Sequence, residues 1–99
     1  METELSVTDN EFLRQFECDI DGDLSKIEYS QQDRKIFLTK LVMSEELKEK
    51  GYMEPFIAKV LEIIKERNIS VMPTSPAVVR YMKKHRRRYK DMLPVGINI

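Results

Sequence analysis

The chain has 99 residues, of which 41% are hydrophobic and 34% are charged, and its formal net charge is zero. These values predict one globular domain with a modest core and exclude a disordered chain. No apolar run approaches the roughly 20 residues that are needed to cross a membrane. The single cysteine, Cys18, excludes an internal disulfide and a multi-cysteine zinc site, so we expect a cytoplasmic protein without a metal ion or a membrane contact.

Three antiparallel strands are predicted first along the chain. Residues 11–20 (EFLRQFECDI) alternate between two faces, as a half-buried strand does. One face carries Phe12, Arg14, Phe16 and Cys18, and the other carries Leu13, Gln15 and Glu17. Asp21 and Gly22 predict a hairpin turn to a second strand over 23–30, and the polar run QQDR predicts another turn at 31–34. The third strand, KIFLTKLVM at 35–43, is apolar at nearly every position from Leu41, which is typical of a central strand.

Two helices are predicted after the third strand. Residues 44–51 (SEELKEKG) indicate a short helix with Ser44 as its N-cap and Gly51 at its end. From position 53 onward the apolar residues lie three and four positions apart, which predicts an amphipathic helix of about four turns. These residues are Met53, Phe56, Ile57, Val60, Leu61 and Ile64.

A short apolar strand and a third helix complete the predicted domain. The strand is NISVMP at 68–73, and the helical crossover before it predicts that it runs parallel to the third strand. In residues 74–85 (TSPAVVRYMKKH), Ser75 is the predicted N-cap, Pro76 takes the first helical position, and His85 follows Val78 and Met82 along one face. The order βββ-α-α-β-α predicts an α+β domain over 11–90, with tails at 1–10 and 91–99.

The charges are unevenly distributed along the chain. Residues 1–34 hold ten acids and three bases (−7), whereas residues 35–99 hold seven acids and fourteen bases (+7). Seven of the eleven residues in RYMKKHRRRYK, at 80–90, are Lys or Arg. A basic half favours a phosphate-bearing ligand or a polyanion, and a solvated charged helix is the alternative. Nucleic-acid binding is disfavoured, because Tyr81 and Tyr89 are the only aromatic residues in this stretch and no recognition motif occurs.

Gly51 allows two interpretations. It can simply end the short helix, because glycine adopts the left-handed conformation found at helix ends. Alternatively, the turn around it and the start of the next helix can bind phosphate, because unpaired N–H groups and the helix dipole favour an anion there. Lys48 and Lys50 would then add positive charge.

From Glu11 to about Tyr89 the chain resembles the small, single-domain branch of the GNAT acetyltransferase superfamily. The resemblance rests on the order and spacing of three blocks, DIDGDLSKIEY, LVMSEELKEKGYMEPFIAKVLEIIKERNISVMP and PTSPAVVRYMKKH, the last followed by a tyrosine. It implies a mixed sheet that is splayed between the third and fourth strands. It also implies that acetyl-CoA enters this splay and that its pyrophosphate binds at the Gly51 turn.

The resemblance also implies which residues hold acetyl-CoA. Backbone amides of the third strand and the residues of the Gly51 turn take this role. They are Leu41, Val42 and Met43 on the strand, and Lys48, Lys50, Gly51, Tyr52 and Met53 in and beside the turn. The usual family pattern Q/R-x-x-G-x-G/A reads here Lys-Glu-Lys-Gly-Tyr-Met over 48–53, so Met53 stands where the family has a small residue. A long side chain at this position crowds a closely approaching pyrophosphate.

Three candidate catalytic residues follow from the same resemblance. Lys40 stands in place of a histidine, and it can act as a base only if burial or a neighbouring positive charge lowers its pKa. Ser75 stands in place of a cysteine, and its hydroxyl needs a base to act as a nucleophile. His85 matches a family histidine that carries a proton or contacts CoA. The alternatives are a solvated strand lysine, an N-cap and a packed histidine.

Two functions therefore remain open. The first is an acetyl-CoA-dependent N-acetyltransferase of unknown acceptor, which works by direct attack of an amine on the thioester. The second is a non-catalytic CoA-binding or protein-interaction module that keeps the fold but lacks the usual reactive residues. For either function we expect a monomer or a weak homodimer.

Overall fold

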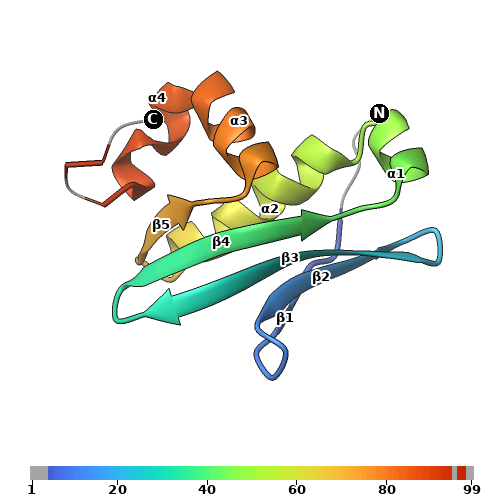
Figure 1. The fold of residues 1–99 in the computed structure, drawn as a ribbon, viewed down its shortest axis with the longest axis horizontal. Helices are drawn as coiled ribbons and strands as arrows, with labels where there is room; N and C mark the ends of the chain where they lie inside the picture. The colour runs from blue at the N-terminus through green and yellow to red at the C-terminus, as the bar shows by residue number, and fades with distance from the viewer. Residues whose placement is uncertain (1–4, 95, 98–99) are drawn as a thin grey trace.

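The structure is a computed structural model of the chain and describes residues 5–94 and 96–97. Five strands form one mixed sheet in the order β1-β2-β3-β4-β5 (Figure 1). The strands are β1 (Thr8–Asn10), β2 (Gln15–Ile20), β3 (Asp23–Gln32), β4 (Lys35–Val42) and β5 (Ser70–Pro73). The first four strands pair antiparallel, and β5 pairs parallel to β4, which confirms the predicted meander and crossover.

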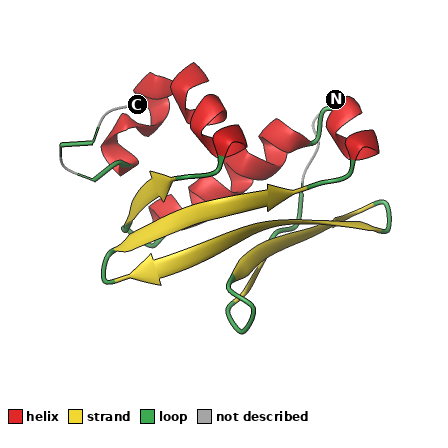
Figure 2. Ribbon diagram, in the orientation of Figure 1, coloured by secondary structure: helices red, strands yellow, loops and turns green. Residues whose placement is uncertain are grey.

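The helical elements follow β4 and β5, as the sequence predicted (Figure 2). They are α1 (Glu45–Glu49), α2 (Met53–Glu66), α3 (Pro76–Lys84), α4 (Arg86–Tyr89) and the 3-10 helix η1 (Lys90–Met92). The α+β architecture and the order of its main elements are therefore confirmed. The additional elements are β1 at the start of the sheet and the two short helices after α3.

Strand β1 lies in the segment that the sequence analysis treated as a tail. It forms a hairpin with β2, and residues 11–14 make the turn. The prediction that Phe12 and Arg14 share one face of a strand with Phe16 and Cys18 was wrong, because residues 11–14 form a turn, in which Phe12 is 93% exposed and Arg14 has a φ of 56°. The backbone N–H of Leu13 donates to Oδ1 of Asn10 at 3.1 Å, which closes the turn.

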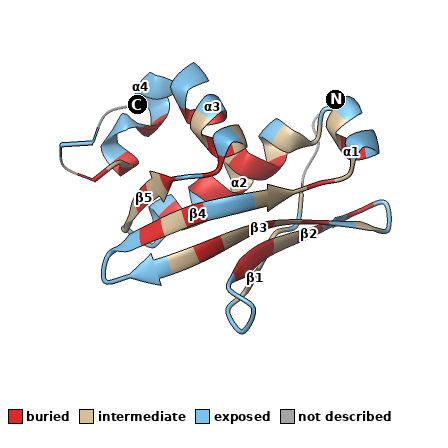
Figure 3. Ribbon diagram, in the orientation of Figure 1, coloured by how far each residue is buried: buried red, intermediate tan, exposed pale blue. Residues whose placement is uncertain are grey.

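The helices gather on one side of the sheet, where the core lies (Figure 3). Alternate residues of β2 and β3 are buried, which is the expected pattern for a sheet with one covered face. The apolar stripe of α2 supplies Phe56, Ile57, Val60, Leu61 and Ile64 to this core, as its spacing predicted. The core extends past position 90, because Met92 in η1 is also buried.

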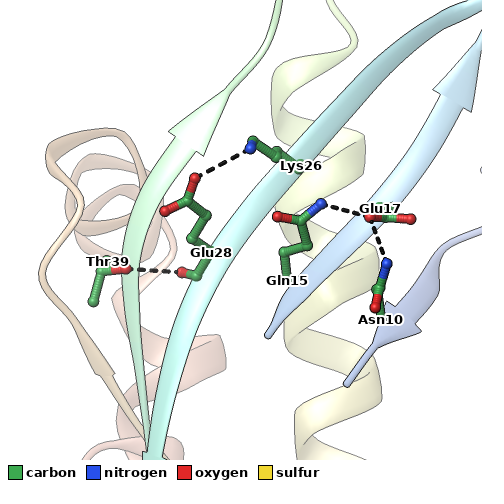
Figure 4. Close-up of polar contacts among 6 residues, drawn as sticks. All are labelled: Asn10, Gln15, Glu17, Lys26, Glu28 and Thr39. Atoms are coloured by element: carbon green, nitrogen blue, oxygen red, sulfur yellow. Dashed lines mark hydrogen bonds and ion pairs between the residues drawn. The ribbon is translucent and has the colours of Figure 1, made fainter. Parts of the chain in front are cut away.

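The opposite face of the meander carries a polar network (Figure 4). Glu17 accepts hydrogen bonds from the side-chain amides of Asn10 and Gln15. Lys26 pairs with Glu28 at 3.2 Å. Of these contacts, the one between Asn10 and Glu17 joins β1 to β2, whereas the other two each lie within a single strand.

Asp9 connects the edge strand β1 to two other elements. Its Oδ1 accepts a hydrogen bond from the Tyr29 hydroxyl at 2.7 Å, and its Oδ2 lies 2.7 Å from a terminal guanidinium nitrogen of Arg67, just after α2. The Arg67 guanidinium also lies over the Phe16 ring, 5.6 Å from its centre. Burial and the hydrogen bond to Asp9 raise the pKa of Tyr29 to about 12.

This raised pKa predicts a loss of stability in alkali. An unfolded tyrosine ionises near pH 10, so the stabilisation linked to neutral Tyr29 is complete below pH 10 and is lost as the pH rises to about 12. We expect Tyr29→Phe to cost about 1–3 kcal/mol of unfolding free energy at pH 7, because a hydrogen bond to a carboxylate is lost. The difference from the wild type should shrink by about 1 kcal/mol per pH unit above pH 10. Urea titrations of both proteins at pH 7, 10 and 11 test this, and a constant difference would contradict it.

Candidate functional site

The parallel pairing of β4 and β5 ends at Leu38. The two strands pair over Lys35–Leu38 and Ser70–Pro73, and the backbone carbonyl of Leu38 then accepts three hydrogen bonds. The backbone N–H groups of Thr74 and Ser75 donate at 3.0 and 2.9 Å, and the Thr74 hydroxyl donates at 3.0 Å. The remainder of β4, from 39 to 42, therefore extends beyond the ladder with β5. Because β5 itself ends at Pro73, the edge of β4 is left open from 39 to 42, and this open edge, at the place where the resemblance implied a splay, is called the splay below.

A β-bulge lies at the point where the splay begins. Glu28 of β3 faces Lys40 of β4, whereas the next residue, Tyr29, faces Leu38. Thr39 is therefore the extra residue of the bulge, and its hydroxyl donates to the backbone carbonyl of Glu28 at 3.1 Å (Figure 4). Lys40 is exposed and lies opposite Glu28, so it lacks burial, one of the two conditions that the sequence set for a base at this position.

Gly51 forms the end of α1. It has a φ of +86°, which favours glycine, and its N–H donates to the carbonyl of Lys48 at 3.0 Å. The Tyr52 N–H donates to the carbonyl of Leu47 at 3.1 Å, and these two bonds together make a Schellman motif. Because the Lys50 N–H also bonds within α1, the amides of positions 50–52 are engaged in ending this helix.

The start of α2 leaves two other amides. In the first turn of a helix the N–H groups have no partner within the helix. Here the third helical position is Pro55, which has no N–H, and the Phe56 N–H already bonds to the Tyr52 carbonyl at 3.1 Å. The amides of Met53 and Glu54 are the ones that the helix itself does not use. Any phosphate at this turn would depend on these two amides and on side chains.

An open groove runs from the Gly51 turn between α2 and α3. One part, of about 670 Å³, is lined by residues of the turn and of both helices. They are Lys48, Gly51, Met53, Glu54, Pro55, Ala58, Tyr81 and His85. A second part, of about 290 Å³, shares Met53, Glu54 and Tyr81 with the first and adds Ile57, Ala77, Arg80 and Lys84. Glu54, Arg80 and Lys84 were not among the predicted site residues, although the four-residue spacing of Arg80 and Lys84 places both on one side of α3.

Tyr81, His85 and Tyr89 form an aromatic cluster at the wall of this groove. The hydroxyl oxygens of Tyr81 and Tyr89 are 3.0 Å apart and buried, and the His85 ring centre lies 4.7 Å from that of Tyr81. Burial and the hydrogen bond with Tyr89 raise the pKa of the Tyr81 phenol above its ordinary value. His85 ends α3, is partly exposed and reaches the groove, so it is the one predicted catalytic residue that lines it.

Ser75 lies where the chain passes from β5 into α3. It is 2% exposed and its backbone is extended, as in an N-cap, but its side chain makes no capping hydrogen bond. Ser75 is therefore the N-cap residue of α3, as predicted, but the hydrogen bond expected from a capping side chain is absent. The chain is held at this point by the backbone bond to Leu38, and Pro76 needs no partner for an N–H. The Ser75 hydroxyl stays close to the start of the splay without a capping role.

The described part of the chain offers neither a metal site nor a membrane span. Residues 5–94 and 96–97 contain no group of three His, Cys, Asp or Glu side chains arranged to hold a metal ion. In the same residues, every helix is too short or too polar to cross a bilayer.

The family model described as GCN5-related N-acetyl-transferase matches residues 15–92, which is more than half of the chain. The matched segment contains the splay, the Gly51 turn and both helices that line the groove. No curated protein matches the chain significantly.

The two serines at helix starts predict different losses of stability. Ser44 caps α1, since its hydroxyl accepts from the Leu47 N–H at 3.3 Å, whereas the Ser75 hydroxyl has no such bond. We expect Ser44→Ala to lower the unfolding free energy by about 1 kcal/mol and Ser75→Ala to lower it by less than about 0.5 kcal/mol. Thermal and urea unfolding of the two variants measure this. A larger loss for Ser75→Ala would show that its hydroxyl does cap α3.

Proposed function

This chain belongs to the GCN5-related N-acetyltransferase (GNAT) family, and from this premise we propose that it binds acetyl-CoA and transfers the acetyl group to an amine. The observation that carries the proposal is the splay. Beyond Leu38, alternate residues of β4 direct N–H and C=O groups toward the side that β5 has left. An extended ligand arm that carries amides would find hydrogen-bonding groups there among Leu41, Val42 and Met43, of which only alternate residues face that side.

The groove supports phosphate binding at the other end of the ligand. It begins at the Gly51 turn, where the amides of Met53 and Glu54 are free of helix bonds, and it is lined by three bases, Lys48, Arg80 and Lys84. Lys50 and Tyr52 flank the turn. Met53 is half-buried in the groove wall and narrows it. These residues fit a phosphate-bearing ligand, with side chains carrying more of the binding than in a glycine-rich loop.

Acetyl-CoA supplies a thioester that an amine can attack directly. In this reaction the nitrogen–carbon bond forms, the carbon–sulfur bond breaks, and the proton lost by the amine passes to solvent or to the leaving sulfur. The chain then contributes mainly by holding the two reactants together. In this proposal Ser75 donates a hydrogen bond near the end of the β4–β5 ladder, and His85, which lines the groove, acts as the proton carrier. Lys40 is exposed on the strand and would act only in contact with the acceptor.

A CoA-binding module without turnover is the second candidate. The exposure of Lys40 favours it, because the strand presents a solvated lysine at the position where the resemblance implies a catalytic histidine. Both candidates need the same CoA site. They differ in whether acetyl-CoA is consumed when an amine is present.

A CoA titration followed by an acetyl-transfer assay tests the proposal. We expect CoA at tenfold its dissociation constant to stabilise the protein by about 1.4 kcal/mol, which raises the melting temperature by several degrees. Turnover is then measured as the release of free CoA thiol from acetyl-CoA, in the presence of a panel of small amines and amino-terminal peptides as acceptors. Binding without thiol release would favour the non-catalytic module, and no binding at millimolar CoA would refute both candidates.

Gly51→Ala separates the two roles that the sequence allowed for this residue. Alanine at a φ of +86° should cost about 1–2 kcal/mol of stability. The N–H of the residue already bonds to Lys48, so we expect the folded variant to keep its CoA affinity within about twofold. Calorimetry at 10 °C, well below the melting temperature, measures this. A selective loss of affinity would mean that the turn contacts the ligand directly.

A further inference from the structure

One ion pair crosses the groove and joins its two walls. Nζ of Lys84, in α3, lies 3.0 Å from Oε2 and 3.4 Å from Oε1 of Glu54, in α2. Both residues line the part of the groove that also contains Arg80. Among the ion pairs of the described residues, this is the one that links α2 to α3.

We propose that the carboxylate of Glu54 competes with the ligand phosphate for Lys84, an inference that rests on the proposed CoA site. In the free protein its carboxylate occupies Lys84 and bridges the groove. A ligand phosphate entering the groove takes the place of this carboxylate on Lys84, and the Glu54 side chain turns toward solvent. Glu54 thereby sets the affinity for the ligand without contacting it in the bound state.

The charges of the groove support this exchange. Glu54 places a negative charge beside the bases that would receive a phosphate, so it both occupies Lys84 and repels a second anion. Its side chain is 50% exposed and that of Lys84 is 61% exposed. Exposed pairs of this kind are weak and readily exchanged. A phosphate with two negative charges is a stronger partner for Lys84 than a single carboxylate.

The other bases near the turn do not bridge the groove. Lys48 pairs with Glu45 and Lys50 pairs with Glu46, each at 3.5 Å, and both pairs lie at the short helix α1 and its end. Arg80 has no carboxylate within ion-pair distance among the described residues, so it is available to a ligand as it stands. Removal of the Glu54 charge should therefore free Lys84 alone.

Glu54→Gln tests the proposal, because it keeps the size of the side chain and removes its charge. We expect CoA to bind about two- to fivefold more tightly to this variant than to the wild type in low salt, and the gain to shrink in 0.5 M NaCl. Glu62→Gln is the matched control. Glu62 lies on the same helix and pairs with Lys59 at 4.0 Å, outside the groove, so its replacement should leave CoA affinity unchanged.

A double variant shows whether the effect passes through Lys84. Lys84→Gln alone should weaken CoA binding, and Glu54→Gln added to it should bring little further gain. Isothermal titration of CoA into the wild type, the three single variants and the double variant gives the comparison, with circular dichroism confirming that each is folded. If the wild type and Glu54→Gln bind CoA with equal affinity, the proposed competition by Glu54 is overturned, whereas the proposed CoA site still stands. If Glu54→Gln raises CoA affinity as much in the Lys84→Gln variant as in the wild type, the competition is overturned as well. If neither the wild type nor any variant binds CoA, both the competition and the CoA site are overturned.

Discussion

The carbonyl oxygen of Leu38 fixes the geometry on which the rest of the molecule depends. By accepting three hydrogen bonds from Thr74 and Ser75, it stops the parallel ladder and turns the chain from β5 into α3. Since β4 continues past this point whereas β5 ends at Pro73, the edge of β4 is left open, and α3 then packs beside α2. The open strand edge, the groove and the placement of Ser75 all follow from where this ladder ends. The bulge at Thr39 lies next to it on the other side of β4.

The regular elements were accessible from the sequence because each has a local cause. The spacing of apolar residues predicted α2, and the helical crossover between two apolar runs predicted the parallel strand. Strand β1 was not accessible in this way, because its three residues carry no periodic signal and are held by Asp9, whose partners are Tyr29 and Arg67. The turn at 11–14 was missed for the same reason. Phe12 fits the alternation of a strand, and only the pairing of β1 shows that it lies outside one.

The candidate site was predicted to a similar degree. The Gly51 turn and the splay followed from the resemblance to a family, whereas the bonds that each group makes did not. Whether a serine caps a helix depends on its rotamer and on the neighbouring backbone, so Ser44 and Ser75 look alike in the sequence and differ in the structure. The contact between Glu54 and Lys84 joins residues that are 30 positions apart. No local pattern predicts such a contact. It means that Lys84, one of the bases lining the groove, is already paired with a carboxylate.

The short length of the outer strands has a consequence for how the protein behaves in concentrated solution. An exposed strand edge can act as a template on which another molecule adds its own strand, and long flat edges therefore promote aggregation. Here β1 contributes three residues at one edge, and β5 contributes four at the other and ends at Pro73, which has no N–H to donate. The part of β2 that extends past β1 is also short and carries the exposed Asp19. A sheet of five strands thus leaves little backbone at its outer strands for a second copy to extend.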